Sequence, residues 1–258
     1  MPSQSSIIEV AGRKIQLTQG GQGAPLLYLH SAAGETDWTA FHEQLSRRYH
    51  VYLPAHPGFA VSGGLESIHD IQDLAWHTID LIASLGCSRL SIVGFSLGGW
   101  LAAEVAILRP ALVEKLMLVS SAGIRLPDVR SPDIFLDDRE MLRRVLFHDP
   151  DGELARNFIP QSAQDERMLL WIRAREASAR VAWNPYFHNP KLPGHLRRIQ
   201  APTMLLWGRQ DQVFPLALGE AFRKGIPDCQ LKILENCGHM LPFEKPDDFV
   251  RHCQEFFD

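Results

Sequence analysis

Short apolar runs alternate with longer amphipathic or apolar segments along most of this chain, and this alternation limits the fold more than any other feature. Parallel strands need a long crossover between them, usually a helix, whereas antiparallel strands can be joined by a tight turn. The alternation therefore predicts an α/β fold, with a mostly parallel central sheet and helices on both faces. Strands are predicted at Ile7–Val10, Lys14–Thr18, Pro25–His30, His50–Leu53, Leu90–Gly94, Leu116–Val119, Thr203–Trp207 and Leu231–Leu234.

The first two of these strands lie on either side of Ala11-Gly12, which favours an N-terminal hairpin. Apolar residues recur with the helical period through Ile68–Leu85, and Gly86 then ends the pattern. Proline residues stop other elements, as Pro54 does after the fourth strand. Helices are predicted at Trp38–Arg48, Ile68–Leu85, Leu97–Leu108, Asp137–Phe147, Glu166–Trp183, Leu216–Lys224 and Asp247–Phe257.

The strand–helix rhythm breaks between Ala122 and Ile199, where the sequence is charged and helical and contains no convincing strand. We expect residues 125–195 to form a helical cap at the carboxyl edge of the sheet, where open α/β sheets bind ligands. Residues 1–124 and 196–258 would then form the core domain.

Composition excludes several classes of protein. With 45% hydrophobic residues and a net charge of −4, the chain is neither disordered nor basic enough to predict a nucleic-acid partner. It shows no secretory signal and no apolar run long enough to cross a bilayer. Four scattered cysteines without a CxxC pair indicate reduced thiols in a cytoplasmic protein. We predict no cofactor and no metal site, while the oligomeric state stays open.

The segment Gly94-Phe95-Ser96-Leu97-Gly98 has the form G-x-S-x-G and lies between a predicted strand and a predicted helix. A serine on so tight a strand-to-helix turn leaves room only for small residues two positions before and after it. The turn would raise the Ser96 hydroxyl clear of the sheet at the start of a helix, where the dipole favours a developing anion.

In this context the motif resembles the α/β-hydrolase fold family, and the resemblance extends over residues 25–120 and 200–257. In that family an acid follows the next-to-last strand and a histidine follows the last one. The corresponding positions hold Asp211 and His239. The resemblance implies that Ser96 is the nucleophile, that His239 takes its proton and that Asp211 orients the imidazole.

Two other residues compete for parts of this assignment. Asp128 follows the predicted strand Leu116–Val119, where some family members place the acid, but Asp211 matches the pattern better. His56 lies in a segment where many relatives carry Asp-x-Pro-Gly-x-Gly-x-Ser, and we interpret that segment as a structural turn.

The oxyanion hole implied by the resemblance has two backbone donors. One is the N–H of Leu97, directly after the nucleophile, and the other falls on Ala32 in the loop that begins at His30. The loop departs from the family's His-Gly-x-x-Gly pattern because Ser31 replaces a glycine. Ser31 either caps a turn or offers a hydroxyl to the site, and the turn is favoured.

The resemblance implies a serine hydrolase, and we predict that it cleaves small to medium carboxylic esters or lactones through an acyl-enzyme. Ser31, Phe95 and Met240 are predicted to line the substrate pocket. Carbon–carbon hydrolases of ring-cleavage products are the alternative, although they tend to carry a polar residue and a tryptophan where this chain has Phe95 and Met240. A non-catalytic ligand-binding protein on the same fold is the third possibility. Aromatic and apolar residues of the cap that could roof an acyl pocket are Phe135, Leu146, Phe147, Phe158, Trp171, Trp183 and Phe187.

Overall fold

The computed structural model describes residues 3–136 and 138–258 and contains one eight-stranded sheet in the order β1-β2-β4-β3-β5-β6-β7-β8. From β4 onward in this order, neighbouring strands pair in parallel. β1 pairs antiparallel with β2, and β2 pairs antiparallel with β4. This arrangement confirms the predicted α/β fold class with its N-terminal hairpin. The strands are β1 Gln4–Val10, β2 Arg13–Gly20, β3 Ala24–Leu29, β4 Tyr49–Pro54, β5 Leu90–Phe95, β6 Val113–Val119, β7 Thr203–Gly208 and β8 Cys229–Leu234.

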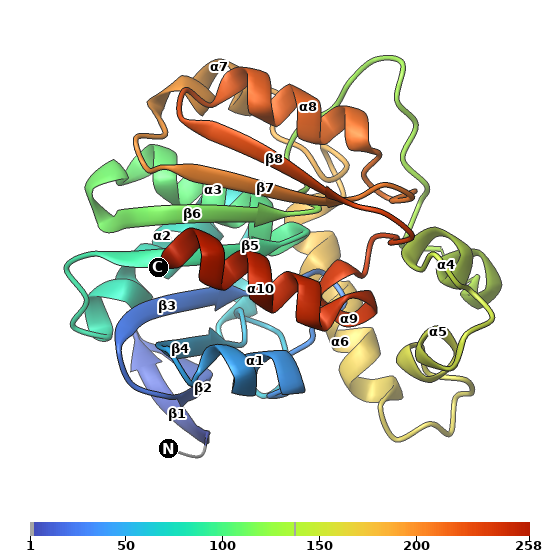
Figure 1. Ribbon diagram of the computed structural model, residues 1–258. Coiled ribbons are helices and arrows are strands. Elements are labelled where there is room, and N and C mark those ends of the chain that lie inside the picture. The colour runs from blue at the N-terminus through green and yellow to red at the C-terminus, as the bar shows by residue number, and fades with distance from the viewer. Residues whose placement is uncertain (1–2, 137) are drawn as a thin grey trace.

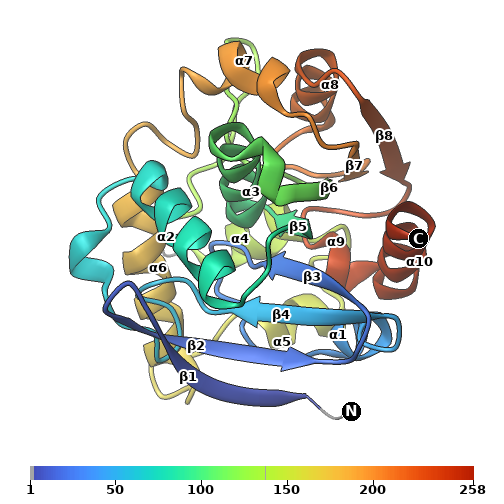
Figure 2. The ribbon, with the colours of Figure 1, turned by 90° about the vertical axis from the view of Figure 1, so that its left-hand side faces the viewer.

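Helices cover both faces of the sheet (Figures 1 and 2): α1 and α10 lie on one face and α2 and α3 on the other. The apolar strand residues are fully buried between these layers, as Leu27, Val93 and Leu118 illustrate. The helices of the core are α1 Ala40–Leu45, α2 Ile71–Ser84, α3 Leu97–Leu108, α8 Leu216–Gly225, α9 Leu241–Glu244 and α10 Pro246–Phe257, with short 3-10 turns at Leu65–Ser67, Pro110–Leu112 and Leu196–Arg198.

Capping residues explain where predicted and observed helix bounds differ. The helix expected from Ile68 begins at Ile71 because Asp70 Oδ1 accepts hydrogen bonds from the backbone N–H groups of Gln72 and Asp73. Ile68, His69 and Asp70, which were predicted as helical, therefore precede the helix. Similarly, α1 is shorter than the predicted Trp38–Arg48 because it starts only after Thr39.

The chain between β6 and β7, residues 120–202, is named the β6–β7 connection. It contains α4 Arg139–Leu146, α5 Glu153–Phe158, α6 Met168–Ala182 and α7 Leu192–His195 and no strand within its described residues. Asp137, at the start of one predicted helix, lies outside the described residues. Figure 1 shows α4, α5 and α6 beyond the carboxyl ends of the parallel strands.

The strand register brings four loops to the same edge of the sheet. Parallel strands β3, β5, β6, β7 and β8 lie side by side, so the residues that follow β3, β5, β7 and β8 emerge together. This edge faces the β6–β7 connection (Figure 1). The last residue pairs before the loops are Leu29–Gly94, Phe95–Val119, Val119–Leu206 and Gly208–Leu234.

Candidate active site

Ser96 occupies a strained turn between β5 and α3. Its φ of 56° and ψ of −113° place a non-glycine residue in a rarely populated conformation. A Cβ at Gly94 would lie 2.2 Å from the Gly98 carbonyl oxygen, and a Cβ at Gly98 would lie 2.1 Å from that of Leu29. Both glycines are therefore sterically required for the turn.

The turn brings Ser96 beside residues from two distant loops. His239 Nε2 lies 3.0 Å from Ser96 Oγ, and His239 Nδ1 lies 3.0 Å from Asp211 Oδ2. All three residues are buried, with 2–4% of their surface exposed. This is the geometry in which an imidazole accepts the serine proton through Nε2 and donates from Nδ1 to a carboxylate.

The Asp211 carboxylate is fixed by its own loop. Oδ1 accepts hydrogen bonds of 2.9 Å from the backbone N–H groups of Val213 and Phe214, so Oδ2 stays directed at the imidazole. The rings of Phe95 and Phe214 lie 5.4 and 5.3 Å from the His239 ring and enclose it. The carboxylate and the imidazole are therefore oriented by contacts that do not involve Ser96.

The loops that carry Asp211 and His239 are hydrogen-bonded to each other. Gln210 N–H donates to the Cys237 carbonyl, and the Cys237 N–H donates back to Gln210 Oε1, both at 3.0 Å. A Cβ at Gly208 would lie 2.2 Å from the Gly238 carbonyl, so the two loops pack backbone to backbone. Acid and histidine thus share one rigid unit although 28 positions separate them in sequence.

The loop after β3 forms a turn built on Ser31. Ser31 Oγ accepts from the Ala33 N–H at 3.0 Å and donates to Glu35 Oε1 at 2.6 Å, while the Ser31 N–H donates to Glu35 Oε2 at 3.1 Å. Burial raises the pKa of the Glu35 carboxyl. Ser31 therefore caps the turn, as expected where it replaces the family's glycine, and it also borders the site.

The two candidate oxyanion donors are available to a ligand. Among the described residues, neither the Ala32 N–H nor the Leu97 N–H donates to a protein acceptor. The Ala32 carbonyl instead accepts a 2.9 Å hydrogen bond from Ser178 Oγ of α6, which fixes the peptide group between Ala32 and Ala33. Such free, oriented N–H groups can stabilise a developing oxyanion.

His30 and His56 support this loop from below. Their rings lie 3.9 Å apart, and His30 Nε2 accepts from the His56 N–H at 3.1 Å. His30 Nδ1 must then carry the proton, and it donates to the Ser31 carbonyl at 2.8 Å. Burial lowers the pKa of His30 to about 4 and that of His56 well below its ordinary range. His56 is thus placed as a structural residue.

The rival acid and one predicted pocket residue do not line the site. Asp128 is exposed, and the carboxylate that His239 contacts is that of Asp211. Phe95 does not appear in the pocket lining that the structure describes, which corrects the expectation that it lines the pocket. As the last residue of β5, it points into the core, fully buried, and packs behind the imidazole.

One cavity adjoins the candidate triad, and a second cavity lies next to the first. The inner cavity, of about 40 Å³, contains Ser96 and His239 and includes the predicted pocket residues Ser31 and Met240. Its remaining walls come from the loop after β3 and from the β6–β7 connection: Ala32, Ala33, Ile134, Phe135, Leu142, Leu146, Trp171, Ala174 and Arg175. The outer cavity, of about 340 Å³, shares Ala33 and Trp171 with the inner one.

A partly buried carboxylate, Glu244, joins the histidine loop to the β6–β7 connection. Oε1 accepts from the Gly238 N–H at 3.0 Å and Oε2 from the His148 N–H at 2.7 Å. Burial raises the pKa of this carboxyl. Sequence reasoning missed Glu35 and Glu244. Of the two, Glu35 is the one whose position could have been suspected from the sequence, because it lies only four residues after Ser31, its hydrogen-bond partner.

Within residues 3–136 and 138–258, no group of three or more histidine, cysteine, aspartate or glutamate side chains is arranged to hold a metal ion. No helix there has both the length and the apolar character that a membrane crossing requires.

The fold agrees with comparisons against known proteins. Residues 26–252 match the model of the Alpha/beta hydrolase family, and the chain belongs to that family. It is 28% identical to 2-hydroxy-6-oxononadienedioate/2-hydroxy-6-oxononatrienedioate hydrolase 2 of Pseudomonas putida, over 92% of this chain and 88% of that protein.

A second type of relative is named for a different activity. The chain is 25% identical to monoacylglycerol lipase abhd6-A of Xenopus laevis, over 92% of this chain and 76% of that protein. Among solved structures, a membrane phospholipase A described as a bacterial virulence factor superposes with a TM-score of 0.82 at 28% identity, over 99% of this chain and 86% of that one. The relatives are thus named for different substrates, a 2-hydroxy-6-oxo dienedioate in one and a monoacylglycerol in the other.

Proposed function

We propose that this chain is a serine hydrolase that cleaves small to medium carboxylic esters or lactones through a covalent acyl-enzyme. The observation that carries the proposal is the position of His239, within 3.0 Å of both Ser96 Oγ and Asp211 Oδ2, beside two unoccupied backbone donors. A serine hydroxyl becomes an effective nucleophile when such a base removes its proton.

The chemistry follows from these contacts. Ser96 Oγ attacks the ester carbonyl carbon while its proton passes to His239 Nε2, and Asp211 stabilises the imidazolium. The N–H groups of Ala32 and Leu97 bind the oxyanion of the tetrahedral intermediate. The intermediate collapses, the C–O bond breaks, and His239 returns the proton to the leaving alcohol. Water then attacks the acyl-Ser96 ester by the same route and releases the acid.

The β6–β7 connection is proposed to act as a cap that selects the substrate, over residues 125–195. Part of the wall of the inner cavity comes from the loops at the edge of the sheet. The rest comes from side chains of this connection, including Leu142, Leu146 and Trp171. Residues 1–124 and 196–258 would supply the chemistry.

Hydrolysis of a carbon–carbon bond in a ring-cleavage product is the second candidate, because the Pseudomonas putida relative is named as a hydrolase of 2-hydroxy-6-oxononadienedioate. The residues beside the triad favour the ester: Phe95 precedes the serine and Met240 follows the histidine, where such hydrolases tend to have a polar residue and a tryptophan.

A substrate panel tests the proposal. Purified protein is assayed with short-chain chromogenic esters, lactones and a ring-cleavage dienoate, with Ser96→Ala as the blank. We expect repeated, Ser96-dependent turnover of the esters or lactones. Turnover of the dienoate alone would shift the assignment to the second candidate. A single turnover or none, with intact ligand binding, would indicate a non-catalytic binding protein.

A further inference from the structure

One face of α6 runs along both cavities beside the candidate triad. Arg167, Trp171, Ala174 and Ser178 recur at helical spacing on this face. Arg167 borders the outer cavity, Trp171 borders both cavities and Ala174 borders the inner one. Ser178 ends the row by donating to the Ala32 carbonyl. Trp171 is therefore the side chain of α6 that stands between the two compartments.

The outer cavity is mostly apolar. Its lining includes aliphatic and aromatic side chains from α5, α6, α9 and the loop between α5 and α6, and it shares Ala33 and Trp171 with the cavity that contains Ser96. A cavity of about 340 Å³ lies at the lower end of the range for small-molecule sites. The apolar members of the lining are Leu154, Phe158, Pro160, Leu170, Trp171 and Phe243.

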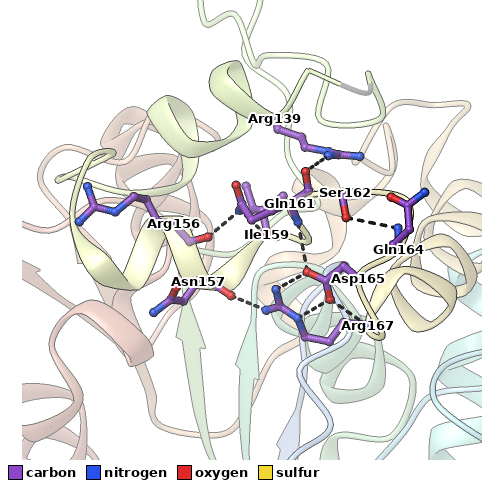
Figure 3. A network of polar contacts seen from close by, with 9 residues as sticks. All are labelled: Arg139, Arg156, Asn157, Ile159, Gln161, Ser162, Gln164, Asp165 and Arg167. Carbon is purple, nitrogen blue, oxygen red and sulfur yellow. Dashed lines mark hydrogen bonds and ion pairs between the residues drawn. The ribbon is translucent and has the colours of Figure 1, made fainter.

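Charged groups around the outer cavity disfavour an anionic ligand. Among the described lining residues, Arg167 carries the cationic side chain, and it is already engaged (Figure 3). Its Nε and Nη2 donate to the Asp165 carboxylate at 3.0 and 2.7 Å, and its Nη1 donates to the Asn157 carbonyl. The carboxyl groups of Glu35 and Asp37 lie on the same wall. A carboxylate placed here would meet neutralised or like charge.

The inner cavity is far smaller. Its volume of about 40 Å³ corresponds to roughly three water-sized groups. Trp171 closes it on one side, and the Arg175 guanidinium lies 5.7 Å from the Trp171 ring centre while it donates to the Ile134 carbonyl at 3.0 Å. A long chain cannot enter this compartment without moving Trp171.

We propose that the outer cavity is the subsite for an uncharged, apolar alcohol portion of the ester, and that Trp171 restricts the acyl portion to a short chain. The proposal rests on the proposed ester hydrolase function. The alcohol leaves halfway through the reaction, whereas the acyl group stays bonded to Ser96, so the wider compartment suits the alcohol and the enclosed one the acyl group.

Two matched ester series test this division. One series holds the acyl group at acetyl and lengthens the alcohol from methyl to hexyl; the other holds the alcohol at methyl and lengthens the acyl group to octanoyl. Acid release is followed by titration. We expect kcat/KM to rise roughly fourfold for each methylene buried in the alcohol series. In the acyl series we expect a fall of about tenfold or more beyond butanoyl.

Adjacent leucines of α6 provide a matched pair of variants. Leu170 lines the outer cavity, whereas Leu169, its 67% exposed neighbour, is absent from the described lining. Leu170→Trp should fill the cavity and abolish the rise across the alcohol series, and Leu169→Trp should preserve it. Trp171→Ala should join the cavities and raise kcat/KM for methyl octanoate about tenfold, with the exposed Trp76→Ala on α2 as its control.

The outcomes separate this inference from the ester assignment. Identical profiles for Leu170→Trp and Leu169→Trp, or a wild-type preference for long acyl groups with methanol as the alcohol, would overturn the inference. If no ester is hydrolysed, the ester assignment fails, and the subsite is tested by whether an alcohol protects Ser96 from fluorophosphonate labelling. In that case 1-hexanol should slow fluorophosphonate labelling of Ser96 in the wild type and Leu169→Trp but not in Leu170→Trp. Equal protection in all three proteins would overturn the subsite.

Discussion

The backbone N–H of His239 donates a 2.9 Å hydrogen bond to the carbonyl oxygen of Leu146, at the end of α4. The Met240 N–H donates to the same oxygen at 3.0 Å. The candidate catalytic histidine is therefore held by the β6–β7 connection as well as by the sheet. Movement of α4 would therefore change the position of the imidazole.

Glu244 strengthens this link, because its two oxygens hold Gly238 and His148 together. Glu244→Ala removes the acceptor of both the buried Gly238 N–H and the His148 N–H and so loosens the histidine loop, and we expect kcat to fall about tenfold with KM little changed. Glu244→Gln keeps one acceptor oxygen and should give an intermediate kcat. Steady-state kinetics with a short ester measures both parameters. Unchanged kcat in Glu244→Ala, or a loss matched by the surface variant Glu220→Ala, would contradict this role.

Asp211 is predicted to orient the imidazole. Asp211→Asn can hydrogen-bond the wrong histidine tautomer, and we expect kcat to fall by up to ~10⁴-fold while the fold is retained. Asp128→Asn is the matched control, because Asp128 is exposed and should leave kcat unchanged. Kinetics and circular dichroism of both variants decide the matter. A larger loss in Asp128→Asn would move the acid to the loop after β6.

Ser31 is predicted to set the direction of the Ala32 N–H. Ser31→Ala removes the hydroxyl that joins the Ala33 N–H to Glu35, and we expect kcat to fall about tenfold with KM nearly constant. An interaction made only in the transition state has this effect on kcat. A rise in KM with kcat unchanged would show that Ser31 contacts the substrate in the ground state instead.

Buried histidines are predicted to make the fold sensitive to acid. Burial lowers the pKa values of His30 and His77 to about 4 and that of His42 to about 3, all below the ordinary value of 6.5. The unfolded chain binds protons that the folded chain excludes, so this stability is complete above about pH 6.5 and is lost as the pH falls towards 4.

Each such histidine should cost about 2 kcal/mol of unfolding free energy at about pH 5. Urea unfolding near neutral pH and at about pH 5 measures the difference. Because His77 is buried with no partner for Nδ1 among the described residues, His77→Gln should flatten the dependence. Equal unfolding midpoints at both pH values would contradict this prediction.

The fold and the central residues were predictable because their signals are local. Ser96 directly follows β5, Asp211 lies three residues after β7 and His239 five residues after β8, and parallel strands deliver such residues to one edge of the sheet. The short helix α5 was not predicted, since its six residues are too few to show a helical period.

The supports of the site were less predictable, because they depend on contacts between distant segments. Glu244 and His148 lie 96 positions apart, and Ser178 and Ala32 lie 146 apart. No local pattern marks either pair. Phe95 was predicted to line the pocket, but alternation along β5 directs its ring into the core.

The account depends most directly on Ser96 as the nucleophile. The measurement is mass spectrometry of the protein after reaction with a fluorophosphonate, performed on the wild type and on Ser96→Ala. The account predicts one adduct, on the peptide that contains Ser96, and none in the variant. An adduct that persists in Ser96→Ala, or that forms on another residue of the wild type, would contradict it.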